Sequence, residues 1–186
     1  MPVKTAELTL TDGMHFDVAT GSGRQFAFDD LATGGLGPVE TVLASLAGCS
    51  AMDVISIALK KRQGIERYTI HATGDQREAY PQIYTRIDLV HEVVGEDLDS
   101  TAIQRCIELS ATRYCPVNAM LSAGDTAVHH RYRIVRPGQA VEEGLVIVTG
   151  PYARPDPVDG ARTASVPVAD AVGNGVRAPD APLSES

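Results

Sequence analysis

The chain has 186 residues, of which 44% are hydrophobic and 22% are charged, and this is typical of one globular domain rather than of a disordered or membrane-embedded chain. The formal net charge of −8 argues against a surface built to neutralise phosphates, because nucleic-acid binding depends on clustered Lys and Arg. We therefore expect a globular protein that binds neither DNA nor a membrane.

The start of the chain and its cysteine count bear on location. The first residues lack an apolar run behind a positive start, so no secretory signal peptide is expected and the cytoplasm is the default location. Three cysteines do not suit a disulfide-stapled secreted scaffold and fit reactive or buried thiols better. The count alone leaves both kinds of thiol open.

The first thirty residues predict a β-meander. Residues 3–10 and 14–19 alternate in polarity and flank Asp12-Gly13, a dipeptide that favours tight hairpin turns. A polar turn at residues 20–23 leads into a third predicted strand, residues 24–28, whose two phenylalanines share one face.

A long apolar helix is predicted next. A Gly-rich loop ends at Pro38, a residue that starts helices well because its missing N–H is not needed there. Residues 39–59 carry apolar side chains almost all round the helix, and their length would suffice to cross a bilayer. Glu40 and Asp53 interrupt the run, and strand patterns lie on both sides of it, so we interpret the segment as a buried central helix.

The second half of the chain predicts two strands, a helix and a last strand. Residues 68–73 and 82–93 have strand patterns. Asp99 or Ser100 can cap a helix that runs to about Tyr114, after which Pro116 kinks or restarts it. Residues 126–135 form the final strand of a β-β-β-α-β-β-α-β pattern.

Residues 137–186 differ in composition from the rest. They hold 7 of the chain's 11 prolines, and seven carboxylates against three arginines. Such a segment buries too little apolar surface to offset the entropy of ordering, so we expect a largely flexible acidic tail. The run at residues 145–148 is the exception, because it can pair as an extra strand or cover an apolar patch.

Two of the three cysteines have distinctive surroundings. Cys49 has the small neighbours Gly48 and Ser50, which would let a substrate or another backbone approach. Cys115 precedes Pro116, and if a helix starts there, its free N–H groups favour the thiolate of Cys115. Both thiols could equally be buried space-fillers. Cys106 lies nine positions before Cys115, roughly 13 Å along one helix, which is too far for a disulfide, so a packing role is expected.

The surroundings of these cysteines resemble two motifs of the OsmC/Ohr family of hydroperoxide reductases. Residues 35–54, GLGPVETVLASLAGCSAMDV, are similar to the family's Gly-x-x-Pro-x-Glu-x-Leu-Leu-x-x-Leu-x-x-Cys helix, and residues 115–118, CPVN, to its Cys-Pro-Val-Ser element. The resemblance and the matching order of elements cover residues 1–136. It implies an OsmC-like α+β domain with two central helices on curved antiparallel sheets, an intertwined homodimer, and active sites at the subunit boundary.

The resemblance also implies a chemistry. Cys49 would attack a peroxide as the peroxidatic thiol and become a sulfenic acid, and Cys115 would resolve it as a disulfide that a cellular dithiol reduces. No metal or organic cofactor is expected. His129 and His130 are adjacent on a predicted strand and point to opposite faces, so they do not suggest a shared metal. The alternative is an OsmC-fold homodimer that binds an apolar small molecule or a partner without turnover.

The family activates its thiol with a glutamate and an arginine, which the resemblance places at Glu40 and Arg24. Glu40 lies nine residues before Cys49, roughly 13 Å away and on the opposite helix face, so it would act across the dimer or serve only as a favourable helix-start charge. Arg24 is the only arginine of the three predicted N-terminal strands. Asp53 follows Cys49 by one turn, and unless it pairs with an arginine, its charge would make Cys49 less reactive.

Overall fold

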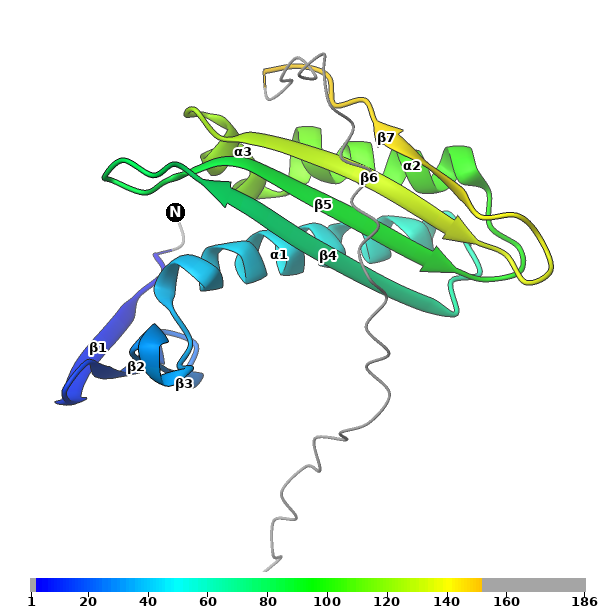
Figure 1. Cartoon of the computed structure of the whole chain (residues 1–186). Helices are drawn as coiled ribbons and strands as arrows, with labels where there is room; N and C mark the ends of the chain where they lie inside the picture. Colours follow the sequence, from blue (N-terminus) through cyan, green and yellow to red (C-terminus); the bar gives the residue numbers. More distant parts are fainter. Residues whose placement is uncertain (1–2, 152–186) are drawn as a thin grey trace, which may run out of the picture. The chain divides into compact units, whose positions relative to one another are not determined.

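The computed structural model describes residues 3–151, which form two separate sheets and three α-helices (Figure 1). The first sheet is an antiparallel meander in the order β1-β2-β3, made of β1 (Ala6–Asp12), β2 (His15–Thr20) and β3 (Gln25–Phe28). Gly13 turns the first hairpin with φ +52°, a conformation that glycine adopts at little cost. The predicted hairpin and third strand are confirmed.

The long helix α1 (Pro38–Lys60) is buried along one stripe only. Its fully covered residues are Leu46, Ser50, Val54 and Ala58, which recur every fourth position and so share one face. Met52 and Leu59 on other faces are 76% and 69% exposed. The predicted buried central helix is therefore buried on one face only within one chain, because a single chain supplies neighbours to one side of α1. Helix α1 is long and apolar enough to cross a membrane, but the core helices of soluble proteins meet the same criteria of length and composition.

The second sheet has four strands in the order β4-β5-β6-β7. These are β4 (Arg67–Gln76), β5 (Tyr84–Val94), β6 (Ala127–Val135) and β7 (Glu142–Val146). Strands β5 and β6 run parallel, whereas the other two pairs are antiparallel. The expectation of purely antiparallel sheets needs correction here, since α2 and α3 form a crossover that returns the chain in the same direction.

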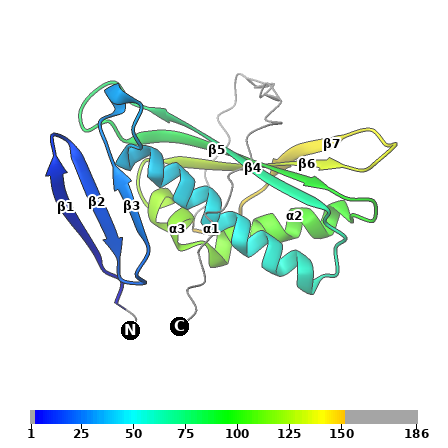
Figure 2. The ribbon, with the colours of Figure 1, turned by 90° about the horizontal axis from the view of Figure 1, so that it is seen from below.

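The helices lie on one face of this sheet, with α1 beside α2 (Figure 2). Inward side chains of β5 alternate with partly exposed ones, as a strand covered on one face requires. The main core lies between α1, α2 and the sheet, and consists of Val54, Ala58, Val93, Leu98, Ile103, Cys106, Ile107, Ile134 and Val146.

The crossover between β5 and β6 is a broken helix. Asp99 caps α2 (Ser100–Leu109) by accepting hydrogen bonds from the N–H groups of Thr101 and Ala102, one of the two predicted caps. A π-helical turn (Ser110–Tyr114) follows α2, and α3 (Pro116–Ser122) follows Cys115. Cys115 itself has extended backbone, φ −75° and ψ 103°, because the ring of Pro116 disfavours the helical region for the residue before it.

Strand β7 extends the folded region past residue 136, the predicted end of the OsmC-like domain. It pairs with β6 from His130↔Val146 to Ile134↔Glu142, so the extra strand exists but includes only Leu145 and Val146 of the predicted run at residues 145–148. The remainder of the predicted flexible tail, residues 152–186, lies outside the described residues.

Candidate active site

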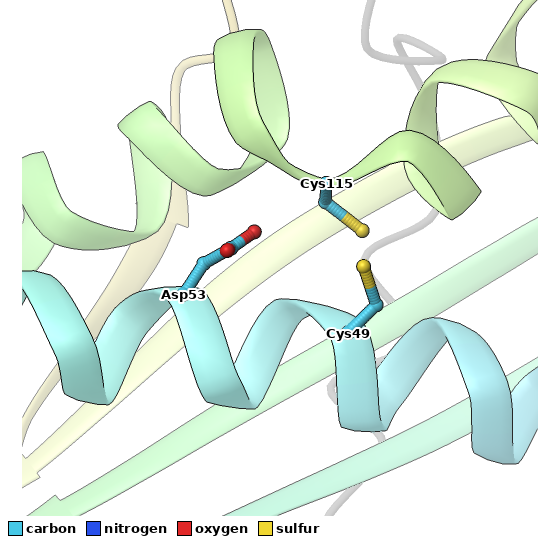
Figure 3. A group of neighbouring side chains, drawn as sticks. All are labelled: Cys49, Asp53 and Cys115. Atoms are coloured by element: carbon cyan, nitrogen blue, oxygen red, sulfur yellow. The ribbon is translucent and has the colours of Figure 1, made fainter. Parts of the chain in front are cut away.

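Two cysteines separated by 66 positions in the sequence meet between α1 and the start of α3 (Figure 3). Cys49 projects from the middle of α1, and Cys115 lies at the break before α3. Their sulfurs and a carboxylate oxygen of Asp53 all lie within 4.8 Å of one another. Both thiols are free. The structure therefore supplies the proximity that thiol–disulfide chemistry requires.

Small side chains let the two segments approach this closely. Ser50, next to Cys49 in the sequence, is fully buried, and its Oγ lies 3.3 Å from Oγ of Ser110 in the π turn. The backbone N–H of Cys115 donates to the carbonyl of Ser110 at 2.9 Å. Ser110 thus connects the helix that carries Cys49 to the break that carries Cys115.

The two thiols have unequal environments. Cys115 is 3% exposed and belongs to a hydrophobic cluster with Leu46, Leu89 and Val128, whereas Cys49 is half-buried at the margin of that cluster. Burial, together with the hydrogen bond to Cys49, raises the pKa of Cys115 to about 12. At neutral pH Cys115 is therefore a protonated thiol, and Cys49 is the sulfur that solvent can reach.

The start of α3 favours the thiolate of Cys115 as predicted, but a larger opposing effect raises the pKa of Cys115 overall. The geometry is as expected, since Cys115 caps α3 and its sulfur accepts a hydrogen bond from the N–H of Asn118 at 3.3 Å. That contact lowers the pKa of Cys115, but desolvation in the apolar cluster is the larger effect. Sequence shows the helix start and does not show the cluster that covers it.

Asp53 has a hydroxyl partner. Oγ of Ser110 donates to Oδ2 of Asp53 at 3.1 Å. Within residues 3–151 no arginine or lysine is ion-paired with Asp53, so of the two alternatives that the sequence left open, pairing with an arginine is not found in the described part of one chain. The three acidic groups Cys49, Asp53 and Cys115 therefore form a cluster with one sign of charge when ionised.

The structure does not bring Glu40 or Arg24 to these thiols within one chain. Glu40 is exposed in the first turn of α1, where its charge adds to the burial that raises the pKa of Tyr84. Arg24 is exposed in the turn before β3, where its backbone N–H donates to Oγ1 of Thr20 at 3.2 Å. A role for either side chain at the thiols would require a second copy of the chain.

Comparison with known proteins places this arrangement in a family. The sequence model of OsmC-like proteins matches residues 29–130, which include both cysteines and the helices that position them. The chain belongs to the family of OsmC-like proteins.

Relatives and solved structures of the family align with most of the length of this OsmC-like chain. Protein YhfA of Escherichia coli strain K12 is 35% identical over 131 residues, which are 70% of this chain and 97% of YhfA. A crystallised OsmC-like protein of Mycoplasma pneumoniae has a TM-score of 0.64 at 18% identity, covering 73% of this chain and 99% of that one. An organic hydroperoxide resistance protein of Elizabethkingia anophelis has a TM-score of 0.54 at 15% identity, covering 73% and 97%. At these identities the two structures support the fold.

A buried row of hydrogen-bonded side chains lies behind Cys115 in this OsmC-like protein, and it was not predicted from the sequence. Asn118 Oδ1 lies 3.2 Å from Nε2 of His130, Nδ1 of His130 lies 3.1 Å from Nε2 of His91, and Nδ1 of His91 lies 2.6 Å from Oη of Tyr68. Nδ2 of Asn118 donates to the carbonyl of Ala111 at 2.9 Å.

The donor and the acceptor in each of these hydrogen bonds follow from the group at the Asn118 end. The amide oxygen of Asn118 can only accept, so Nε2 of His130 donates to it, Nε2 of His91 donates to His130, and Tyr68 donates to His91. Both imidazoles are neutral, because burial lowers the pKa of His91 well below 6.5 and that of His130 to about 4. The alternation of β6 places His130 on one face, but only the parallel pairing with β5 sets it beside His91.

Cys106 packs in the protein interior. It is fully buried in the main core on α2, in a different cluster from Cys115. Burial raises the pKa of the Cys106 thiol, which disfavours the reactive thiolate.

Proposed function

We propose that this OsmC-like protein is a thiol peroxidase that reduces organic hydroperoxides, with hydrogen peroxide as a second substrate. The sulfur of Cys49 attacks the distal oxygen of the O–O bond, the bond breaks, and the alkoxide leaves as an alcohol after taking up a proton. Cys49 becomes a sulfenic acid. The sulfur of Cys115 then attacks Cys49, the S–O bond breaks, and the departing hydroxide leaves as water with the thiol proton of Cys115.

The disulfide formed in that step must be reduced for another turnover. A cellular dithiol fits this requirement, because a thiolate attacks one sulfur of the disulfide, and a second thiol of the reductant releases the mixed disulfide. We expect the reaction to take place in the cytoplasm, where such dithiols are kept reduced.

The observation that carries this proposal is the unequal exposure of two adjacent thiols. A peroxidatic thiol must be reached by substrate, and Cys49 is half-buried, whereas Cys115 is 3% exposed directly beside it. The relative named an organic hydroperoxide resistance protein supports organic hydroperoxides as the substrate class.

We infer that the protein acts as a homodimer. An open apolar surface lies along the outer face of α1 and is formed by Met52, Ile55, Leu59 and their neighbours. Such a surface is costly to leave in water. A second copy of the chain would cover it, and could bring Glu40 or Arg24 of one protomer to the thiols of the other.

Peroxide turnover tests the enzymatic proposal. Reduced protein is mixed with tert-butyl hydroperoxide and excess dithiothreitol, and the loss of peroxide is followed. Cys49→Ser should reduce turnover to the rate without protein, whereas Cys106→Ala should leave it within about twofold, because Cys106 lies in the core. Loss no faster with the native protein than with Cys49→Ser would contradict catalysis and favour the alternative, a homodimer that binds an apolar small molecule or a partner at its interface without turnover.

Mass spectrometry tests the order of the thiols. After one equivalent of peroxide the native protein should contain a Cys49–Cys115 disulfide. Cys115→Ser should instead form a sulfenic acid at Cys49 that dimedone traps. Sulfinic or sulfonic acid at Cys49 in the native protein, without the disulfide, would argue against Cys115 as the resolving thiol.

A further inference from the structure

The cluster of Cys49, Asp53 and Cys115 has the composition of a metal site. Its two sulfurs and one carboxylate oxygen come from two separate elements and lie within 4.8 Å of one another. Tetrahedral zinc with bonds of about 2.3 Å to sulfur and about 2.0 Å to oxygen needs ligand atoms about 3.5–3.8 Å apart. Small side-chain rotations would therefore place all three atoms around one ion.

The charge of the cluster favours a cation. Two thiols and a carboxyl group, which bind metals in their deprotonated forms, share one site. Within residues 3–151 Asp53 has a hydroxyl rather than an arginine or lysine as its partner. A divalent cation would neutralise two of the three charges, and it would replace the thiol protons on binding.

Two of the three donor residues already have the outer hydrogen bonds that metal ligands require. Ser110 donates to the carboxylate of Asp53, and the N–H of Asn118 donates to the sulfur of Cys115. The side chain of Asn118 is held in turn by the buried row of hydrogen bonds through His130, His91 and Tyr68. Partners of this kind orient ligands and strengthen metal binding.

The ligand set selects among metals. Two thiolates favour zinc or Cu(I) over magnesium and calcium, and the carboxylate favours Zn²⁺ over Cu(I). Cys49 is half-buried, so the fourth tetrahedral position would face solvent and take a water molecule, as in zinc sites with three protein ligands. We propose that the reduced Cys49–Cys115 pair, together with Asp53, binds one Zn²⁺ ion, and that formation of the disulfide abolishes the site.

Zinc titration tests this proposal without reference to peroxide turnover. Full-length protein is treated with a reductant and a chelator, freed of both, and titrated with ZnCl₂ against a chromophoric chelator. One ion should bind per chain. Cys49→Ser and Asp53→Asn should each weaken binding at least about 100-fold, and Ser110→Ala about 10-fold. Asp97→Asn, an exposed carboxylate away from the cluster, is the matched control and should bind like the native protein.

Oxidation of the native protein provides a second test of the zinc site that needs no substitution. Diamide removes two electrons and two protons from the pair as Cys49–Cys115 disulfide forms and diamide becomes its hydrazine. The oxidised protein should lose zinc binding, and dithiothreitol followed by desalting should restore it. Co²⁺ in place of zinc should give the near-ultraviolet charge-transfer band of thiolate ligands, absent in Cys49→Ser. Absence of binding by the reduced protein, or equal binding by the oxidised protein, would overturn the proposal whether or not the protein consumes peroxide.

Discussion

The four-stranded sheet has its inner face covered by α1 and α2, whereas the three-stranded sheet leaves every residue of β1 exposed. Helix α1 also has a covered face and an exposed face, since Leu46 on one is fully buried and Leu59 on the other is 69% exposed. One chain thus completes the half of the molecule that holds the thiols. The other half leaves these surfaces exposed in one chain, and the proposed homodimer would cover them.

The largest expected effect is the loss of stability when a side chain on the buried face of α1 is truncated. Leu46→Ala should lower the free energy of unfolding by about 3 kcal/mol, because it removes buried methyl groups and leaves a cavity beside Cys115. Leu59→Ala removes the same atoms from the exposed face, and should change stability by less than about 0.5 kcal/mol in the monomer. Urea denaturation at a monomeric protein concentration measures both, and equal losses would mean that the two faces do not differ.

The buried histidines predict acid destabilisation of the four-stranded half. The pKa of His130 is lowered to about 4, so as the pH falls the unfolded chain binds a proton near 6.5, before the folded chain does. Stability is therefore complete above pH 6.5 and falls by about 3 kcal/mol between pH 6.5 and 4 on account of this group. Urea denaturation across this range should show a shallower fall for His130→Gln, and the same fall in both proteins would exclude His130 as the cause.

A charge on the open face of α1 should separate the proposed dimer without unfolding the chain. Met52→Glu places a carboxylate on the apolar surface of α1, and should raise the dissociation constant of the dimer about 100-fold, or about 2.7 kcal/mol. Ile147→Glu is the matched control, since Ile147 is also 76% exposed but follows β7. Analytical ultracentrifugation measures both, with circular dichroism as the check on folding; equal dissociation in the two variants would move the interface away from α1.

The exposed histidine of the three-stranded sheet should show a small effect of opposite sign. Nδ1 of His15 lies 2.9 Å from Oδ2 of Asp29, and this hydrogen bond raises the pKa of His15. Its contribution to stability is complete below pH 6.5 and disappears as the pH rises through the raised pKa. Proton NMR should find His15 titrating above 6.5, and nearer to 6.5 in Asp29→Asn, while His130 titrates near 4. An unchanged His15 pKa in Asp29→Asn would show that the pair is not formed.

Local patterns in the sequence determined the hairpin at Asp12-Gly13, the cap at Asp99 and the helix break at Pro116, because each depends on the backbone preferences of a few neighbouring residues. The two family motifs likewise identified Cys49 and Cys115 as the residues to examine. These features need no knowledge of distant contacts.

Only the tertiary structure decided what surrounds the thiols. The crossover through α2 and α3 makes β5 and β6 parallel, and this register places His91 beside His130 behind Cys115. Packing of α1 on the π turn gives Asp53 a serine as its hydrogen-bond partner. The apolar cluster around Cys115 outweighs the favourable start of α3, because desolvation depends on every element that covers a group, and these elements come from distant parts of the sequence.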